Sequence, residues 1–224
     1  MIATYHQYIL DFKRPSGTSR GLMTTKETWF IRLEKDNAVG VGECGILRGL
    51  SIDYRPDFEE KLKWTCIQFG LETAFKSLEN EDQFQLFPSP FTKGFDSIPI
   101  NGLVWMGSED FMRAQIKEKI EAGFDCIKLK IGAIDFQTEL DILKSIRKEF
   151  SKSDIELRVD ANGAFSKADA LEKLKRLSEY QLHSIEQPIK AKQFKAMAQL
   201  CEDTPLPIAL DEELIGVFSR EDSN

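Results

Sequence analysis

Five charged residues lie near the ends of predicted strands in the second half of the chain. Lys128 and Lys130 are two positions apart in FDCIKLKIG, a stretch that otherwise has the apolar character of a buried strand. Asp160, Glu186 and Asp211 end three later strand-like stretches. Alternate residues of a strand share one face, and parallel strands end at the same edge of a sheet, so these side chains should meet.

The types of these residues predict acid-base chemistry beside a metal ion. Three carboxylates held together without a cation place like charges in a poorly solvated cleft, which raises their pKa values or destabilises the fold. A hard divalent cation removes this repulsion, and all-oxygen ligation suits Mg²⁺ or Mn²⁺ better than zinc. A lysine near that cation has its neutral form favoured, so it can act as a base near neutral pH.

Each residue also has a simpler interpretation. A single Asp after a strand is commonly a helix N-cap or a turn residue. A single strand lysine commonly extends its amine to solvent. We favour the chemical interpretation because the carboxylates follow successive strands and two inward lysines accompany them.

Strand-like and helical segments alternate strictly in the second half of the chain, and these are the elements that would position the charged residues. The strand-like segments are residues 98–105, 125–132, 155–162, 182–188 and 207–213, and the helical ones are 108–123, 135–150, 166–180 and 191–202. This alternation predicts parallel strands with helical crossovers, in a doubly wound sheet or a (β/α)8 barrel. No GxGxxG follows the first of these strands, which favours the barrel.

The first part of the chain predicts a separate α+β domain. YHQYILDF, ETWFIRLE and AVGVGEC have strand character, with a hairpin turn at KDN, and a helix is expected from Phe58 to Leu78 with Asp57 as its N-cap. QLFPSPFTKGFDS predicts a packed connector. We place the domain boundary there, which gives domains of residues 1–95 and 96–224.

Composition excludes several classes of protein. The 224 residues are 42% hydrophobic with 16 Phe, which predicts a globular chain with a real core. The net charge of -7 argues against a nucleic-acid partner. The sequence has no basic and apolar leader and no apolar run of about 18 residues, so we expect no membrane partner and a cytoplasmic location. Its four cysteines are widely spaced without a CxxC pair, which predicts neither a zinc site nor disulfides.

The motifs KLKIG, RVDANGAF, HSIEQPI and PIALDEELIG, preceded by GVGECGIL and PINGLVWMG, together resemble the enolase superfamily, muconate-lactonizing subgroup. Within it they are most similar to the o-succinylbenzoate synthases of menaquinone biosynthesis. The resemblance covers nearly the whole chain. It implies an N-terminal α+β capping domain followed by a (β/α)8-type barrel.

The resemblance also implies roles for individual residues. Asp160, Glu186 and Asp211 would bind Mg²⁺, with Mn²⁺ as an alternative ion. Lys130 would be the catalytic base, and Lys128 would lie beside it and help to keep its amine neutral.

Four further residues are named with them. Asn162 would support the ligands or face the substrate. RPSGTSRGLMTTK would form a substrate lid, in which Arg20 and Met23 are candidates for substrate contact. Arg158 is expected to pack structurally within the barrel.

The implied reaction is a Mg²⁺-dependent loss of water from 2-succinyl-6-hydroxy-2,4-cyclohexadiene-1-carboxylate. Lys130 would remove a proton to give an ene-diolate and return it to the departing hydroxide on the same face, a syn elimination. One alternative is an N-succinylamino acid racemase or dipeptide epimerase of the same superfamily, with a lysine on each face of the substrate. Another is a catalytically silent truncated fragment. Each active alternative takes a small carboxylate, and the oligomeric state is left open.

The sequence departs from the family pattern in length. Five of the eight barrel strands are expected, and the family's further lysine on the sixth strand would follow Asn224. We therefore expect the 224-residue chain alone to be inactive and a chain extended by three βα units to be active.

Overall fold

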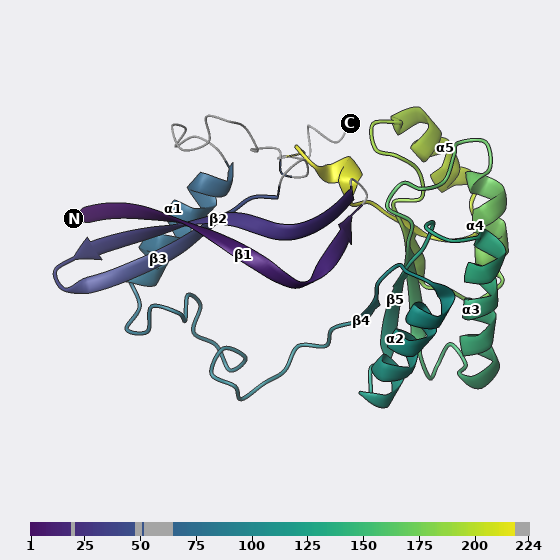
Figure 1. Cartoon of the computed structure of the whole chain (residues 1–224), viewed down its shortest axis with the longest axis horizontal. Coiled ribbons are helices and arrows are strands. Elements are labelled where there is room, and N and C mark those ends of the chain that lie inside the picture. The colour runs from purple at the N-terminus through teal and green to yellow at the C-terminus, as the bar shows by residue number, and fades with distance from the viewer. Residues whose placement is uncertain (19–20, 48–50, 52–64, 218–224) are drawn as a thin grey trace. The chain divides into compact units, whose positions relative to one another are not determined.

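The computed structural model describes residues 1–18, 21–47, 51 and 65–217 (Figure 1). The chain divides into two compact units, residues 1–98 and 99–224. In the described part of the chain, no helix combines the length and apolar character that crossing a bilayer requires.

The first unit contains a three-stranded antiparallel sheet. Its strands pair in sequence order and are β1 (Ile2–Thr18), β2 (Gly21–Lys35) and β3 (Ala38–Gly45). Lys35 pairs with Ala38 across a two-residue turn in which Asp36 and Asn37 have φ of 50° and 69°. Two positive φ values are what a tight hairpin between twisted strands requires, so the turn predicted from KDN is confirmed.

Helix α1 (Thr65–Leu78) packs closely against β3. A Cβ added to Gly40 or Gly42 would lie 2.1 Å or 1.8 Å from a main-chain oxygen of the helix. Only glycine permits this approach of sheet and helix. The helix expected from the sequence begins earlier, at Phe58 with Asp57 as its cap, and both positions lie outside the described residues.

The connector after α1 leaves its aromatic rings in solvent. Phe84, Phe87, Phe91 and Phe95 are 77%, 69%, 48% and 85% exposed. The expectation of a packed connector is therefore wrong for these side chains. Its hydrogen bonds are local, such as Phe95 N–H to Pro90 O at 2.8 Å, so the turns form without burial of the rings.

The second unit is a parallel sheet whose spatial order follows the sequence. Its strands are β4 (Gly102–Val104), β5 (Cys126–Lys130), β6 (Glu156–Asp160), β7 (Ser184–Glu186) and β8 (Ile208–Ala209). The connecting helices are α2 (Glu109–Glu121), α3 (Phe136–Glu149), α4 (Ala170–Ser178) and α5 (Phe194–Asp203). In a doubly wound sheet, the spatial order of the strands changes direction at one point of the sequence. The described strands keep one direction from β4 to β8, as the strands of a (β/α)8 barrel do.

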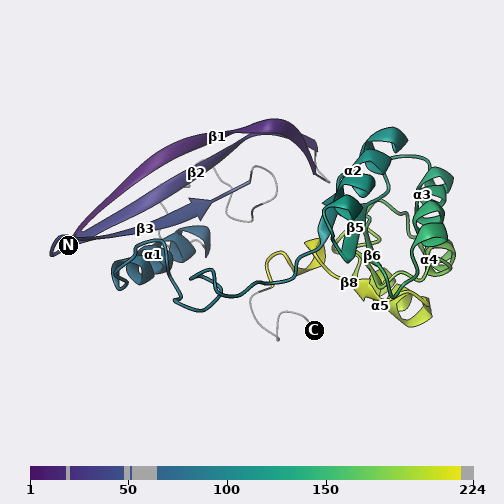
Figure 2. The same ribbon diagram turned by 90° about the horizontal axis from the view of Figure 1, so that it is seen from below.

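The two faces of the parallel sheet differ in chemistry. Figures 1 and 2 show α3 and α4 along one side of its strands, and the apolar strand positions form the core with the helices. Ile127, Leu129, Leu157, Val159 and Ile185 are each at most 1% exposed. The alternating positions of β5, β6 and β7 carry polar and charged groups, so these lie on the opposite face.

Candidate active site

The register of the parallel sheet brings the predicted residues to one edge. Lys130 lies beside Asp160, and Asp160 lies beside Glu186, at the carboxyl ends of β5, β6 and β7. Asp211 follows the end of β8, the next strand of the sheet. The edge predicted to carry the chemistry therefore contains a lysine and carboxylates from neighbouring strands.

The amine of Lys130 is held by three groups. It donates to Asp160 Oδ2 at 2.8 Å and to Asn162 Oδ1 at 2.7 Å. The ring centroid of Trp105 lies 5.7 Å from the same nitrogen, within range of a cation-π interaction. Sequence reasoning did not name Trp105, although its place directly after β4 is the position at which barrel strands present functional side chains.

Lys128 lies between two of the carboxylates. Its amine is 3.4 Å from Asp160 Oδ2 and donates a hydrogen bond to Glu186. Burial alone favours the neutral amine, but the hydrogen bond to Glu186 and the charge of Asp160 outweigh it, so the pKa of Lys128 is raised. The role expected of Lys128, to favour the neutral amine of Lys130 by like-charge repulsion, requires a charged Lys128 and stays a prediction.

Asp160 is the most buried of the predicted ligands, at 1% exposed. Its Oδ2 accepts from Lys130, and its Oδ1 accepts from the main-chain N–H of Asn162 at 2.9 Å. A buried carboxylate is tolerated when opposite charges and hydrogen bonds replace its water, and both of its oxygens are satisfied in this way.

Asn162 links two sides of the site. Its φ is 44°, in the left-handed region that Asn tolerates better than most residues. The side-chain oxygen accepts from Lys130, while Nδ2 donates to Glu212 Oε1 at 3.3 Å. Asn162 therefore connects the end of β5 to the segment after β8.

The electrostatics of Asp211 place it in the same cluster. Asp211 is exposed, yet partial desolvation of its carboxyl raises the pKa, and the negative charges of Glu212 and Asp160 raise it further. The charges of Lys128 and Lys130 oppose that shift. An Asp that experiences these four groups is more easily protonated than an ordinary surface carboxyl, unless a cation lies beside it.

The carboxylate oxygens are not gathered around one point. In the described ranges, no three His, Cys, Asp or Glu side chains form a group that could hold a metal ion. Asp160 and Glu186 instead share the ammonium of Lys128, so a positive charge already lies between them. Carboxylate oxygens from adjacent strand ends are the donor type that hard divalent cations prefer. The types of donor in this site thus suit such a cation.

The remaining residues named from the sequence are Arg20, Met23 and Arg158. Arg20 is outside the described residues, and Met23 is a partly buried residue of β2 in the first unit. Their contact with substrate stays a prediction. Arg158, expected to be structural, pairs with Glu156 at 2.6 Å at the amino end of β6.

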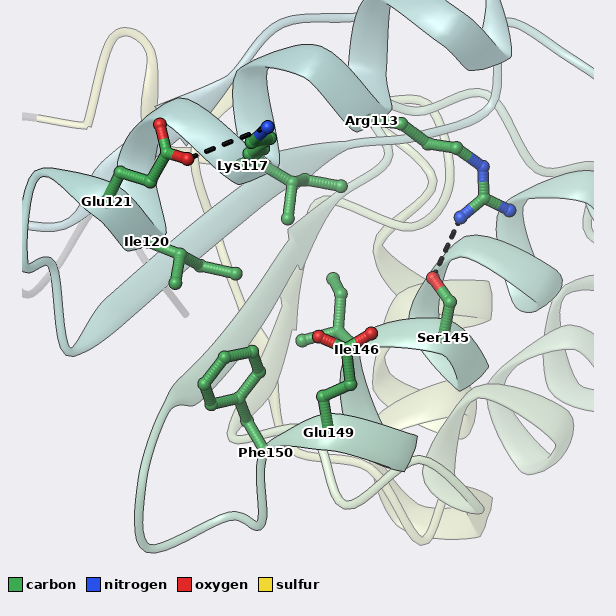
Figure 3. A pocket seen from close by; sticks show the side chains of 9 residues that line it. Arg113, Lys117, Ile120, Glu121, Ser145, Ile146, Glu149 and Phe150 are labelled. Atoms are coloured by element: carbon green, nitrogen blue, oxygen red, sulfur yellow. Dashed lines mark hydrogen bonds and ion pairs between the residues drawn. The ribbon is translucent and has the colours of Figure 1, made fainter.

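The hollow drawn in Figure 3 lies between α2 and α3, away from the strand ends. Its volume is about 360 Å³, and Ile120, Ile146 and Phe150 contribute apolar lining. On its rim Arg113 donates to Ser145 Oγ at 2.8 Å. None of its lining residues belongs to the charged cluster, so this hollow is not the candidate active site.

Comparison with known sequences identifies relatives over the whole chain. A family model described as "Enolase C-terminal domain-like" matches residues 111–222. The o-succinylbenzoate synthase of Desulfotalea psychrophila is 40% identical over 273 residues, which cover 100% of this chain and 74% of that protein. An L-amino acid-D/L-Glu epimerase of Francisella philomiragia is 36% identical over 110 residues, which cover 48% of this chain and 30% of that protein.

Solved structures agree with these matches. The crystal structure of MenC from Desulfotalea psychrophila has a TM-score of 0.84 at 37% identity and covers 98% of this chain and 73% of that one. An o-succinylbenzoate synthase from Thermosynechococcus elongatus, complexed with magnesium in its active site, has a TM-score of 0.75 at 23% identity. It covers 95% of this chain and 69% of that one, and its likeness concerns the fold.

Proposed function

The chain belongs to the enolase superfamily, and we propose that it acts as an o-succinylbenzoate synthase. Its antiparallel sheet and its five-stranded parallel sheet match a capping domain and part of a (β/α)8 barrel. We propose that the two domains meet near residue 95, in the connector. The observation that carries the functional proposal is the amine of Lys130, held 2.8 Å from a buried carboxylate at the strand ends.

The comparisons favour a synthase over an epimerase. The synthase is 40% identical over 100% of this chain, whereas one epimerase is 36% identical over 48% of it and another is 24% identical over 93%. The proposed substrate is accordingly 2-succinyl-6-hydroxy-2,4-cyclohexadiene-1-carboxylate, a small molecule whose carboxylate is suited to a site that holds a divalent cation.

Lys130 is the proposed catalytic base. When its pairing with Asp160 is released, the neutral amine removes the proton from the carbon that bears the substrate carboxylate. The resulting ammonium then gives this proton to the departing hydroxyl group on the same face. One C–H bond and one C–O bond break, a C=C bond forms, and water leaves an aromatic ring.

The carboxylates supply the other half of the proposed chemistry. We propose that Asp160, Glu186 and Asp211 hold Mg²⁺, with Mn²⁺ as an alternative ion. When bound, this cation stabilises the negative charge that develops on the substrate carboxylate. Lys128 balances the charge of Asp160 and Glu186, as it does in this structure.

Residues around the amine would orient it and exclude water. Asn162 holds the amine from one side, and Trp105 covers it with an aromatic ring. Arg20 and Met23 are the proposed contacts for the succinyl side chain or the ring of the substrate.

Direct assay of the purified protein tests this function. The cyclohexadiene carboxylate is supplied beside a panel of N-succinylamino acids and dipeptides, with Mg²⁺ present and with Mg²⁺ removed by chelation. From a chain extended by three βα units we expect Mg²⁺-dependent dehydration, measured by the absorbance of the aromatic product, and from the 224 residues alone we expect none. Racemisation or epimerisation without dehydration would favour the alternative activity instead.

A further inference from the structure

The side-chain amide of Gln187, the residue after Glu186, is fully buried and uses every hydrogen-bonding position. Its exposed fraction is 0%. Oε1 accepts from the main-chain N–H groups of Asp211 at 3.1 Å and Glu213 at 3.2 Å. Nε2 donates to the carbonyl of Ile189 at 3.0 Å and to Glu213 Oε2 at 3.2 Å. A primary amide has two donor hydrogens and two acceptor sites, so this group is saturated.

The main chain of Gln187 makes two further connections. Its N–H donates to Ala209 O of β8 at 2.9 Å, and its carbonyl accepts from Gly163 N–H at 2.7 Å. Its φ of 40° lies in the left-handed region, which costs a residue with a Cβ atom about 1 kcal/mol or more. The main-chain hydrogen bonds of Gln187 to Ala209 and Gly163 offset this cost.

Glu213 extends the same network to a second loop. It is 9% exposed, and while its Oε2 accepts from Gln187, its Oε1 accepts from Lys192 N–H at 2.9 Å. The loop after β7 and the segment after β8 are therefore joined by one amide and one carboxylate. Both groups are largely removed from water, which makes the loss of any of these bonds costly.

We propose that Gln187 is a positioning residue that sets the separation of the Glu186 and Asp211 carboxylates. It follows Glu186 directly in the chain, and its Oε1 holds the main-chain N–H of Asp211. The main chain at Glu186 and the main chain at Asp211 cannot move apart unless a buried hydrogen bond of this amide breaks. Insofar as these carboxylates hold a divalent cation, the inference rests on the proposed function.

The environment specifies an amide and no other side chain of this size. Two N–H donors face one end of the group, and two oxygen acceptors face the other. Methionine would leave all four partners without a bond. Glutamate would set a second carboxylate against Glu213 and repel it.

Gln187→Met tests the proposal, with Gln193→Met as the matched control. Gln193 lies in the same loop and donates to Lys190 O at 2.8 Å. The first readout is amide hydrogen exchange of the peptide that covers residues 209–214, and the second is calorimetric titration with Mg²⁺. For Gln187→Met we expect exchange at least about tenfold faster in this peptide and at least about tenfold weaker Mg²⁺ binding, the effect of about 1.4 kcal/mol from a broken buried bond. Gln193→Met should change neither.

The two readouts separate this inference from the proposed function. Unchanged exchange of residues 209–214 in folded Gln187→Met overturns the positioning role, whatever the metal affinity. A parent protein that binds no Mg²⁺ overturns the proposed cation site, while the exchange measurement still decides the role of Gln187. If Gln187→Met does not fold, Gln187→Glu keeps the side-chain volume, and the same faster exchange is required of it.

Discussion

The two ends of the polar face in the parallel sheet carry similar charges but hold them differently. At the amino end Arg158 pairs with Glu156 at 2.6 Å, with side chains 42% and 39% exposed. At the carboxyl end Lys130 pairs with Asp160 at 2.8 Å, with side chains 15% and 1% exposed. An exposed pair contributes about 0–1 kcal/mol, whereas removal of one partner from a buried pair costs about 3–5 kcal/mol.

The backbone explains why only the carboxyl end forms a cluster. After β5, β6 and β7 the chain turns through residues of positive φ, namely Gly132, Asn162 and Gln187. These turns direct main-chain N–H groups at carboxylates, as Asn162 N–H does at Asp160 and Gly132 N–H does at Glu139. Charged residues on a strand face are therefore not sufficient to form an active site. The loops must also donate hydrogen bonds to the carboxylates and orient them.

The largest expected difference between the two ends is in catalysis. Lys130→Met removes the proposed base and should lower kcat by about 100- to 10,000-fold, the usual contribution of a positioned acid-base group. Arg158→Met, at the amino end, is the matched control and should retain most of the parental kcat. Steady-state dehydration kinetics of the chain extended by three βα units measure both. A Lys130→Met enzyme with parental kcat would show that another residue is the base.

The next difference concerns stability without metal. Asp160→Asn removes the buried partner of Lys130, while Lys128 keeps Glu186, and should lower the free energy of unfolding by about 3–5 kcal/mol. Glu156→Gln breaks only an exposed pair and should cost about 0–1 kcal/mol. Urea unfolding in the presence of a chelator compares the two variants. Equal losses would mean that burial does not distinguish the two ends.

Stabilisation by Mg²⁺ should also differ between variants at the two ends of the sheet. Mg²⁺ at about 100 times its Kd should stabilise the parent by about 2.7 kcal/mol, because it binds only the native state. Glu186→Ala should abolish this protection, and Glu156→Ala should preserve it. Thermal unfolding with and without Mg²⁺ provides the measurement. If Glu186→Ala binds Mg²⁺ as tightly as the parent, the ligand assignment is wrong.

The smallest expected effect is a pH dependence of the free energy of unfolding. It arises from Glu139, whose carboxylate accepts from Gly132 N–H in the loop after β5. Burial raises the pKa of Glu139, against the opposing N–H groups of Gly132, Ile134 and Ala133. A carboxyl with a raised pKa binds more protons in the folded state, so folding loses stability as the pH rises from its ordinary value of 4.5 through the folded value. Glu139→Gln removes this titration.

Urea unfolding at a series of pH values measures that loss. The free energy of unfolding of the parent, relative to Glu139→Gln, should fall as the pH rises above 4.5. Parallel curves for the two proteins would contradict a raised pKa for Glu139.

Much of the fold follows from the sequence because its signals are local. The alternation of strand-like and helical segments predicted each described element of the parallel sheet, and KDN predicted the hairpin turn. Strand periodicity also placed Lys130, Asp160 and Glu186 on one face. The rings of the connector were predicted wrongly, because their burial depends on surfaces that a local pattern does not contain.

Only the tertiary structure decided how the charged groups pair. Lys130 meets Asp160 across 30 residues of sequence, and Lys128 meets Glu186 across 58. Sequence spacing assigned each residue to a strand face, but it did not show that Lys128 lies between two carboxylates, that Trp105 covers the amine, or that Gln187 joins two strand ends. Those contacts depend on strand register and on the paths of the loops, which arise from packing the whole sheet, whereas periodicity depends only on neighbours along the chain.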